Sequence, residues 1–129
     1  MRPKRDSYYG SLKALLLLGR VSNLPTVWSN CLGSWLLAGG ALLESAEVQR
    51  FAWLITGSTL LFLAGMFLND AFDVQFDREH RPERPIPSGD ITAKAVWALG
   101  IVQLLLGLGC LVYVNTLATL CALGLAGSI

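Results

Sequence analysis

Three long stretches of this chain carry no charged side chain, and they constrain the fold more than any other feature. Residues 21–43 and 51–69 are uncharged, and no acidic or basic residue follows Lys94. A helix needs about 20 apolar residues to cross the hydrocarbon core of a bilayer. Only 15% of the residues are charged, against about 25% in an average soluble domain. We therefore predict an all-α membrane protein, folded as a bundle of transmembrane helices.

Four segments are predicted to be spans, and they occupy residues 20–43, 51–75, 93–114 and 117–129. The first three are long enough to cross a bilayer, whereas the fourth holds only about half of a span. A cytoplasmic or interfacial segment, residues 1–19, precedes them. Part of it, residues 7–19, forms either a short helix at the interface or the first turns of the first span.

The charges of the connections predict how the spans are oriented. Basic residues gather before the first span and again in the connection of residues 73–92, whereas the connection after the first span is mainly acidic. An excess of lysine and arginine marks the cytoplasmic side of a membrane. We therefore expect the N-terminus and the aspartate-rich connection to lie in the cytoplasm. The net charge of +1 gives no reason to expect a nucleic-acid partner.

A row of polar side chains ends the second predicted span. At about 100° per residue, its members share one face if the helix continues to residue 77. Like charges one turn apart repel each other, and carboxylates at membrane depth cost more still. Mg²⁺ takes oxygen ligands and commonly binds carboxylates together with substrate phosphates. The row therefore predicts a Mg²⁺–diphosphate site. The alternative is a solvated helix end, above all for the last member of the row. The members of the row are Asn69, Asp70, Asp73 and Asp77.

The connection that follows the row is rich in arginine and proline. Arg78, Arg81 and Arg84 can offer forked donors to phosphate oxygens. Each of them has the alternative role of a charge that sets the topology. Three prolines between residues 82 and 87 stiffen the connection, and Thr92 is the expected N-cap of the third span.

These motifs together resemble the UbiA-type intramembrane prenyltransferase superfamily. The stretch "NDAFDVQFD" (69–77) is similar to its N-D-x-x-D-x-x-x-D signature, and "RPERPIPSG" (81–89) resembles the loop that follows it. The stretch "LGRVSNLPTVWSN" (18–30) resembles the first-helix entry of the family. The resemblance implies transfer of an isoprenoid from a prenyl diphosphate to a lipophilic acceptor, often aromatic, as in lipid-quinone biosynthesis. Mg²⁺ would lie between the aspartates and the diphosphate, and the protein itself would be in contact with membrane lipid.

The resemblance also implies roles for individual residues. Asn69, Asp73 and Asp77 match positions implicated in metal and diphosphate binding, and Asp70 matches the second letter of the motif with a less direct role. Arg20 matches an arginine that faces the diphosphate or the acceptor, and Asn30 lies on a wall that meets the acceptor.

One departure from the family is large. Its members have about nine spans, each long enough to cross the bilayer, and a second D-x-x-x-D motif in the later half. The last acidic residue here is Asp90. We therefore expect an N-terminal fragment of a larger prenyltransferase, which is inactive without the C-terminal half.

Two other classes of protein are alternatives to a prenyltransferase. Intramembrane acids also mark ion pathways, so a non-enzymatic ion-pathway protein or an assembly protein is one alternative. A CDP-alcohol phosphotransferase is another, although residues 70–80 lack the glycine pattern of that class.

Overall fold

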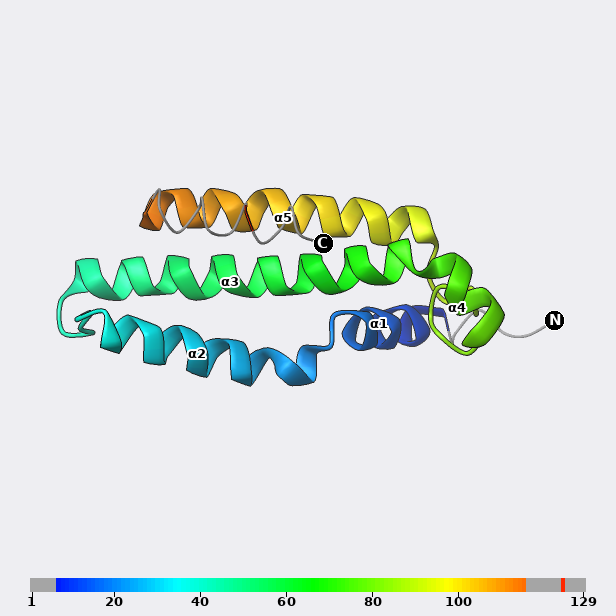
Figure 1. Ribbon diagram of the computed structural model, residues 1–129, viewed down its shortest axis with the longest axis horizontal. Coiled ribbons are helices and arrows are strands. Elements are labelled where there is room, and N and C mark those ends of the chain that lie inside the picture. The colour runs from blue at the N-terminus through cyan, green and yellow to red at the C-terminus, as the bar shows by residue number, and fades with distance from the viewer. Residues whose placement is uncertain (1–6, 116–123, 125–129) are drawn as a thin grey trace.

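The computed structural model describes residues 7–115 and residue 124, and its regular elements within these residues are helices (Figure 1). In chain order they are α1 (Ser7–Leu18), η1 (Val21–Asn23), α2 (Leu24–Leu37), α3 (Ser45–Phe72), α4 (Val74–His80) and α5 (Ala93–Val114). The predicted all-α class is confirmed for this part of the chain. Apart from residue 124, the predicted fourth span (117–129) lies outside the described residues.

The long helices α3 and α5 lie side by side along the molecule (Figure 1). Both are long and apolar enough to cross a membrane. Glycines bring their backbones together, because a Cβ placed on Gly107 would lie 3.1 Å from the carbonyl oxygen of Gly57. Close approach at small residues is a common way for transmembrane helices to associate. The α3–α5 pair is therefore the frame of the described structure.

The first predicted span is shorter in the structure than the sequence suggested. Its regular part is η1 followed by α2, which has 14 residues and is about 21 Å long, less than the hydrocarbon core of about 30 Å. Arg20 adopts a left-handed backbone conformation (φ 45°) and separates α1 from α2. Gly39, with φ 82°, follows the end of α2. A third full span is thus not confirmed, and α1 is a separate helix.

The ends of the other predicted spans can be compared directly. Helix α3 begins earlier than predicted, at Ser45, and ends at Phe72. Asp73 (φ −79°, ψ 0°) separates it from α4, so one helix does not run to residue 77. Helix α5 has the predicted bounds, and the expected cap is present, because Thr92 Oγ1 accepts a hydrogen bond of 3.3 Å from the backbone N–H of Ala95.

A small hydrophobic core lies where α1, α3, α5 and the connection after α4 meet. Its buried members come from all four segments: Leu18, Phe67, Ala71, Ile86 and Val96. Burial of one such side chain contributes about 1.5–3 kcal/mol. Because Ile86 belongs to the core, the arginine-rich connection is held against the end of the helix pair.

The exposed surface of α5 is largely apolar. Leu105, Leu106 and Val112 of α5 are each more than half exposed. A soluble monomer rarely exposes a large continuous apolar surface, whereas lipid tails or further helices would cover such a surface in a membrane.

Candidate active site

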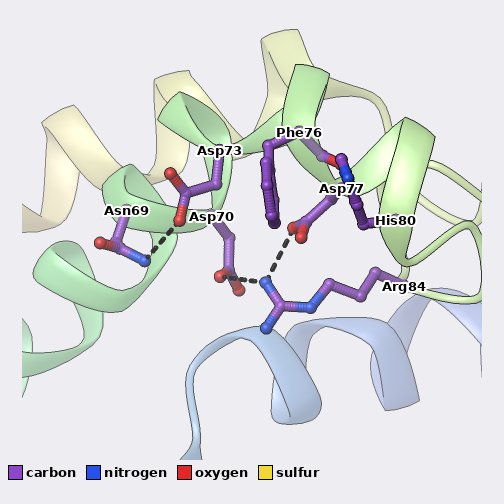
Figure 2. A network of polar contacts seen from close by, with 7 residues as sticks. All are labelled: Asn69, Asp70, Asp73, Phe76, Asp77, His80 and Arg84. Carbon is purple, nitrogen blue, oxygen red and sulfur yellow. Dashed lines mark hydrogen bonds and ion pairs between the residues drawn. The ribbon is translucent and has the colours of Figure 1, made fainter.

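The four side chains of the polar row form two pairs with different surroundings (Figure 2). The first pair is exposed and consists of Asn69, in the last turn of α3, and Asp73. Asn69 Nδ2 donates a hydrogen bond of 3.3 Å to Asp73 Oδ2. Both side chains remain accessible at the end of α3, so their oxygens are open to a ligand from outside.

The second pair is buried and shares one arginine. Arg84 Nη1 donates to Asp70 Oδ1 at 3.2 Å and to Asp77 Oδ2 at 2.8 Å. Only 7% of Asp70 and 2% of Asp77 are exposed. Figure 2 shows the guanidinium of Arg84 between α1 and the two carboxylates. Two carboxylates removed from water need such a positive partner, since an unpaired buried charge is strongly destabilising.

One oxygen of this buried pair has no partner. Asp77 Oδ1 is inaccessible to solvent and makes no hydrogen bond to the described residues. An unsatisfied buried acceptor costs about 1–3 kcal/mol, and a metal ion or a bound donor would remove that cost. Oxygen ligands of this kind are the donors that Mg²⁺ prefers. The residues present therefore fit a divalent cation, although no group of three His, Cys, Asp or Glu is assembled as a ready metal site among the described residues.

A hollow of about 260 Å³ lies beside the buried pair. Basic, acidic and apolar side chains line it together. The lining residues are Leu17, Leu18, Arg20, Asp70, Glu83, Arg84 and Pro85. Two of its charges are guanidinium groups from distant parts of the chain, those of Arg20 and Arg84. An anion in this hollow would find forked donors on two sides and a possible cation site at Asp70.

The other predicted site residues, Arg78, Arg81 and Asn30, do not line the hollow. Arg78 and Arg81 are exposed and make no ion pair with the described residues. Asn30 is exposed on α2 and does not line the hollow. Glu83, which the sequence did not single out, does line it. Its position between two candidate arginines was the only signal that could have indicated it.

One further residue in Figure 2, His80, stays within its own helix. Its ring stacks on Phe76, with centroids 4.2 Å apart, and its Nδ1 lies 3.1 Å from the carbonyl oxygen of Phe76. These contacts give His80 a local role in α4.

Comparison with known proteins decides between the classes that the sequence left open. The model of the UbiA prenyltransferase family matches residues 21–128, which include both pairs and the connection after α4, whereas Leu17, Leu18 and Arg20 of the hollow precede the matched region. The chain belongs to the UbiA prenyltransferase family. Proteins of this family generally use a divalent metal, and the family and the apolar helices together indicate an integral membrane protein. The predicted resemblance is thus confirmed.

Several relatives have names that state a prenyl-transfer function. The chain is 41% identical over 101 residues to a digeranylgeranylglyceryl phosphate synthase of Ignicoccus hospitalis, a match that covers 76% of this chain and 30% of that protein. It is 31% identical over 113 residues to the synthase of the same name from Saccharolobus solfataricus, covering 88% and 39%. It is also 31% identical over 111 residues to a 4-hydroxybenzoate octaprenyltransferase of Pectobacterium carotovorum, covering 82% and 37%.

The matched region is only part of each relative. The chain spans between 30% and 39% of the length of these three proteins. No solved structure matches the chain.

Proposed function

We propose that the protein transfers an isoprenoid group from a prenyl diphosphate to an acceptor in the membrane, and that Mg²⁺ assists the reaction. Asn69, Asp73 and Asp77 would hold the metal, with Asp70 beside them. Family membership and the names of the relatives support transfer of a prenyl group. The observation that carries the metal assignment is the buried, unpartnered Oδ1 of Asp77, and the exposed carboxylate of Asp73 adds further oxygen donors.

The reaction requires that a C–O bond breaks and that its electron pair leaves with the diphosphate. The allylic carbon left behind then accepts electrons from the acceptor, which loses a proton as the new bond forms. Bound Mg²⁺ would neutralise the charge that develops on the leaving diphosphate. Arg20 and Arg84, which line the hollow, would donate hydrogen bonds to its outer oxygens.

The apolar surroundings suit the prenyl chain and its reactive carbon. Leu17 and Leu18 line the hollow, and the core residues Phe67 and Ala71 lie on either side of Asp70 in the sequence of α3. Walls of this kind keep water away from an allylic cation, which water would otherwise trap.

Two classes of acceptor follow from the relatives. The 4-hydroxybenzoate octaprenyltransferase supports the aromatic acceptor predicted from the sequence. The synthases of digeranylgeranylglyceryl phosphate support a second class, an isoprenoid glyceryl phosphate. We propose either of these as the acceptor, and Arg78 and Arg81 as further phosphate contacts at the cytoplasmic surface. Because the relatives extend well beyond the matched region, we also propose that the active protein includes such a further portion.

A transfer assay in membranes tests this function. Membranes with the intact protein would be supplied with a labelled prenyl diphosphate and with either 4-hydroxybenzoate or an isoprenoid glyceryl phosphate. We expect labelled product with one acceptor, loss of product in EDTA, and recovery when Mg²⁺ is restored. An Asp73→Ala variant that inserts normally is the control. Product formation at an undiminished rate in EDTA would refute the metal assignment, and no product with either acceptor would refute the proposed acceptors.

A further inference from the structure

A single nitrogen atom of Arg84 lies where a cation shared by two carboxylates would lie. Nη1 contacts Asp70 Oδ1 and Asp77 Oδ2 at the same time, at 3.2 and 2.8 Å (Figure 2). The two carboxylates come from different helices, α3 and α4. Arg84 therefore supplies the positive charge that keeps this buried pair together in the structure.

A divalent cation at the same carboxylates would compete with Arg84. Two positive groups that share one pair of carboxylates repel each other, and the repulsion is strong where water is excluded. Asp77 is 2% exposed, and its second oxygen, Oδ1, is buried without a partner. A cation that used this free oxygen would therefore displace the guanidinium from Oδ2 of the same carboxylate.

The hollow offers Arg84 a second position. Arg84 lines it together with Arg20 and Glu83. The backbone at Arg84 is held on both sides, since its N–H donates to the carbonyl oxygen of Arg81 at 3.1 Å and its own carbonyl oxygen accepts from the N–H of Ser88 at 2.9 Å. The side chain of Arg84 is 26% exposed. Because Arg84 already lines the hollow, a change of side-chain rotamer, without movement of the connection, would turn its guanidinium further into it.

We propose that Arg84 is an internal placeholder for the divalent cation. It pairs with Asp70 and Asp77 while no cation is bound, and it turns to an anion in the hollow when a cation takes the carboxylates. This inference rests on the proposed function for the nature of the anion, a diphosphate. Cation and diphosphate then bind cooperatively. The cation releases the Arg84 guanidinium from the carboxylates, and the diphosphate gives the released guanidinium a new partner in the hollow.

Cation binding can be measured with Mn²⁺, which is detected by electron paramagnetic resonance, on the intact protein in detergent. Without any anion, we expect Arg84→Gln to bind Mn²⁺ at least about tenfold more tightly than the wild type, because the competing charge is gone. Added inorganic pyrophosphate should tighten Mn²⁺ binding in the wild type and much less in the variant. Arg50→Gln is the control, since it removes the same charge from an exposed position near the other end of α3. Equal affinities of Arg84→Gln and Arg50→Gln, or no binding of Mn²⁺ by any of them, would overturn the proposal.

A second measurement needs only the wild type, which matters because the Arg84→Gln variant leaves two buried carboxylates unpaired. Phenylglyoxal modifies accessible arginines, and mass spectrometry of the peptides reports each site. We expect Mn²⁺ alone to raise the rate of modification of Arg84 severalfold, and pyrophosphate added with Mn²⁺ to protect it again. Arg50, which is exposed near the other end of α3, should be modified at the same rate in all three conditions. A rate for Arg84 that does not rise with Mn²⁺ would overturn the placeholder role.

The two proposals fail in different ways. If Arg84 responds to Mn²⁺ and pyrophosphate but no prenyl transfer occurs, the placeholder role stands and the proposed function falls. If transfer occurs but Mn²⁺ does not change the rate of modification of Arg84, the function stands and the placeholder role falls.

Discussion

Asn69 donates a hydrogen bond of 3.3 Å to Asp73 across the end of α3, and both side chains remain exposed. The amide thereby orients the carboxylate without neutralising its charge. This pair is accessible, whereas the pair formed by Asp70 and Asp77 is buried beneath Arg84. The four polar residues of one motif thus occupy two environments, which predicts that their substitutions have different consequences.

Substitution of Asp73 should separate activity from stability. Asp73→Asn keeps the shape of the side chain but removes the charge that a metal requires, so transfer should fall by at least about a hundredfold. Because Asp73 is exposed, the free energy of unfolding should change by no more than about 0.5 kcal/mol. The rate of prenyl transfer and a thermal unfolding curve in detergent provide the two measurements. Glu79→Gln, at another exposed acid of α4, is the control, and an equal loss of transfer there would contradict a specific role of Asp73.

Substitution of Asp77 should instead lower stability. Asp77→Asn removes the negative charge that lies 2.8 Å from Arg84 Nη1 and is 2% exposed. Breaking a buried ion pair by changing one partner typically costs about 3–5 kcal/mol, and Asp70 remains as a partner of Arg84, so we expect a loss of about 2–3 kcal/mol here. Thermal unfolding in detergent, compared with that of Asp73→Asn, measures it. An unchanged unfolding midpoint would show that the Arg84–Asp77 contact does not stabilise the fold.

Arg20 combines an unusual backbone conformation with a side chain that lines the hollow. A left-handed conformation costs a residue with a Cβ about 1–2 kcal/mol, and glycine adopts it without that cost. Arg20→Gly should therefore be more stable than Arg20→Ala by about 1 kcal/mol. Both variants lose the guanidinium, and both should have a higher KM for the prenyl diphosphate. Unfolding curves and steady-state kinetics of the two variants check this, and equal stabilities would argue against strain at residue 20.

Much of the frame could be predicted from the sequence because it depends on local signals. The bounds of α5 follow from an uncharged apolar run and from Thr92, whose hydroxyl caps the helix. Residues seven apart differ by only about 20° in direction on a continuous helix. Asp70 and Asp77 remain close to each other around Arg84 although Asp73 separates α3 from α4.

The selection of Arg84 among three arginines could not be predicted in this way. It depends on the burial of Ile86 against Phe67 and Val96, which are contacts between distant parts of the chain. The break at Arg20 escaped prediction for a related reason. A left-handed arginine has no local signal, since glycine or asparagine is the residue expected there.

The contact between α3 and α5 provides the last prediction. A Cβ at Gly107 would lie 2.9 Å from Leu61 Cγ and 3.1 Å from the carbonyl oxygen of Gly57, whereas a Cβ at Gly109 would meet no described atom within 4 Å. Both substitutions to alanine raise helix propensity by the same amount, about 1 kcal/mol, so the difference between them isolates the contact. We expect Gly107→Ala to be less stable than Gly109→Ala by about 1–3 kcal/mol, the usual cost of overpacking. Thermal unfolding of both variants in the same detergent measures the difference, and equal midpoints would mean that the two helices do not approach as closely as Gly57 and Gly107 indicate.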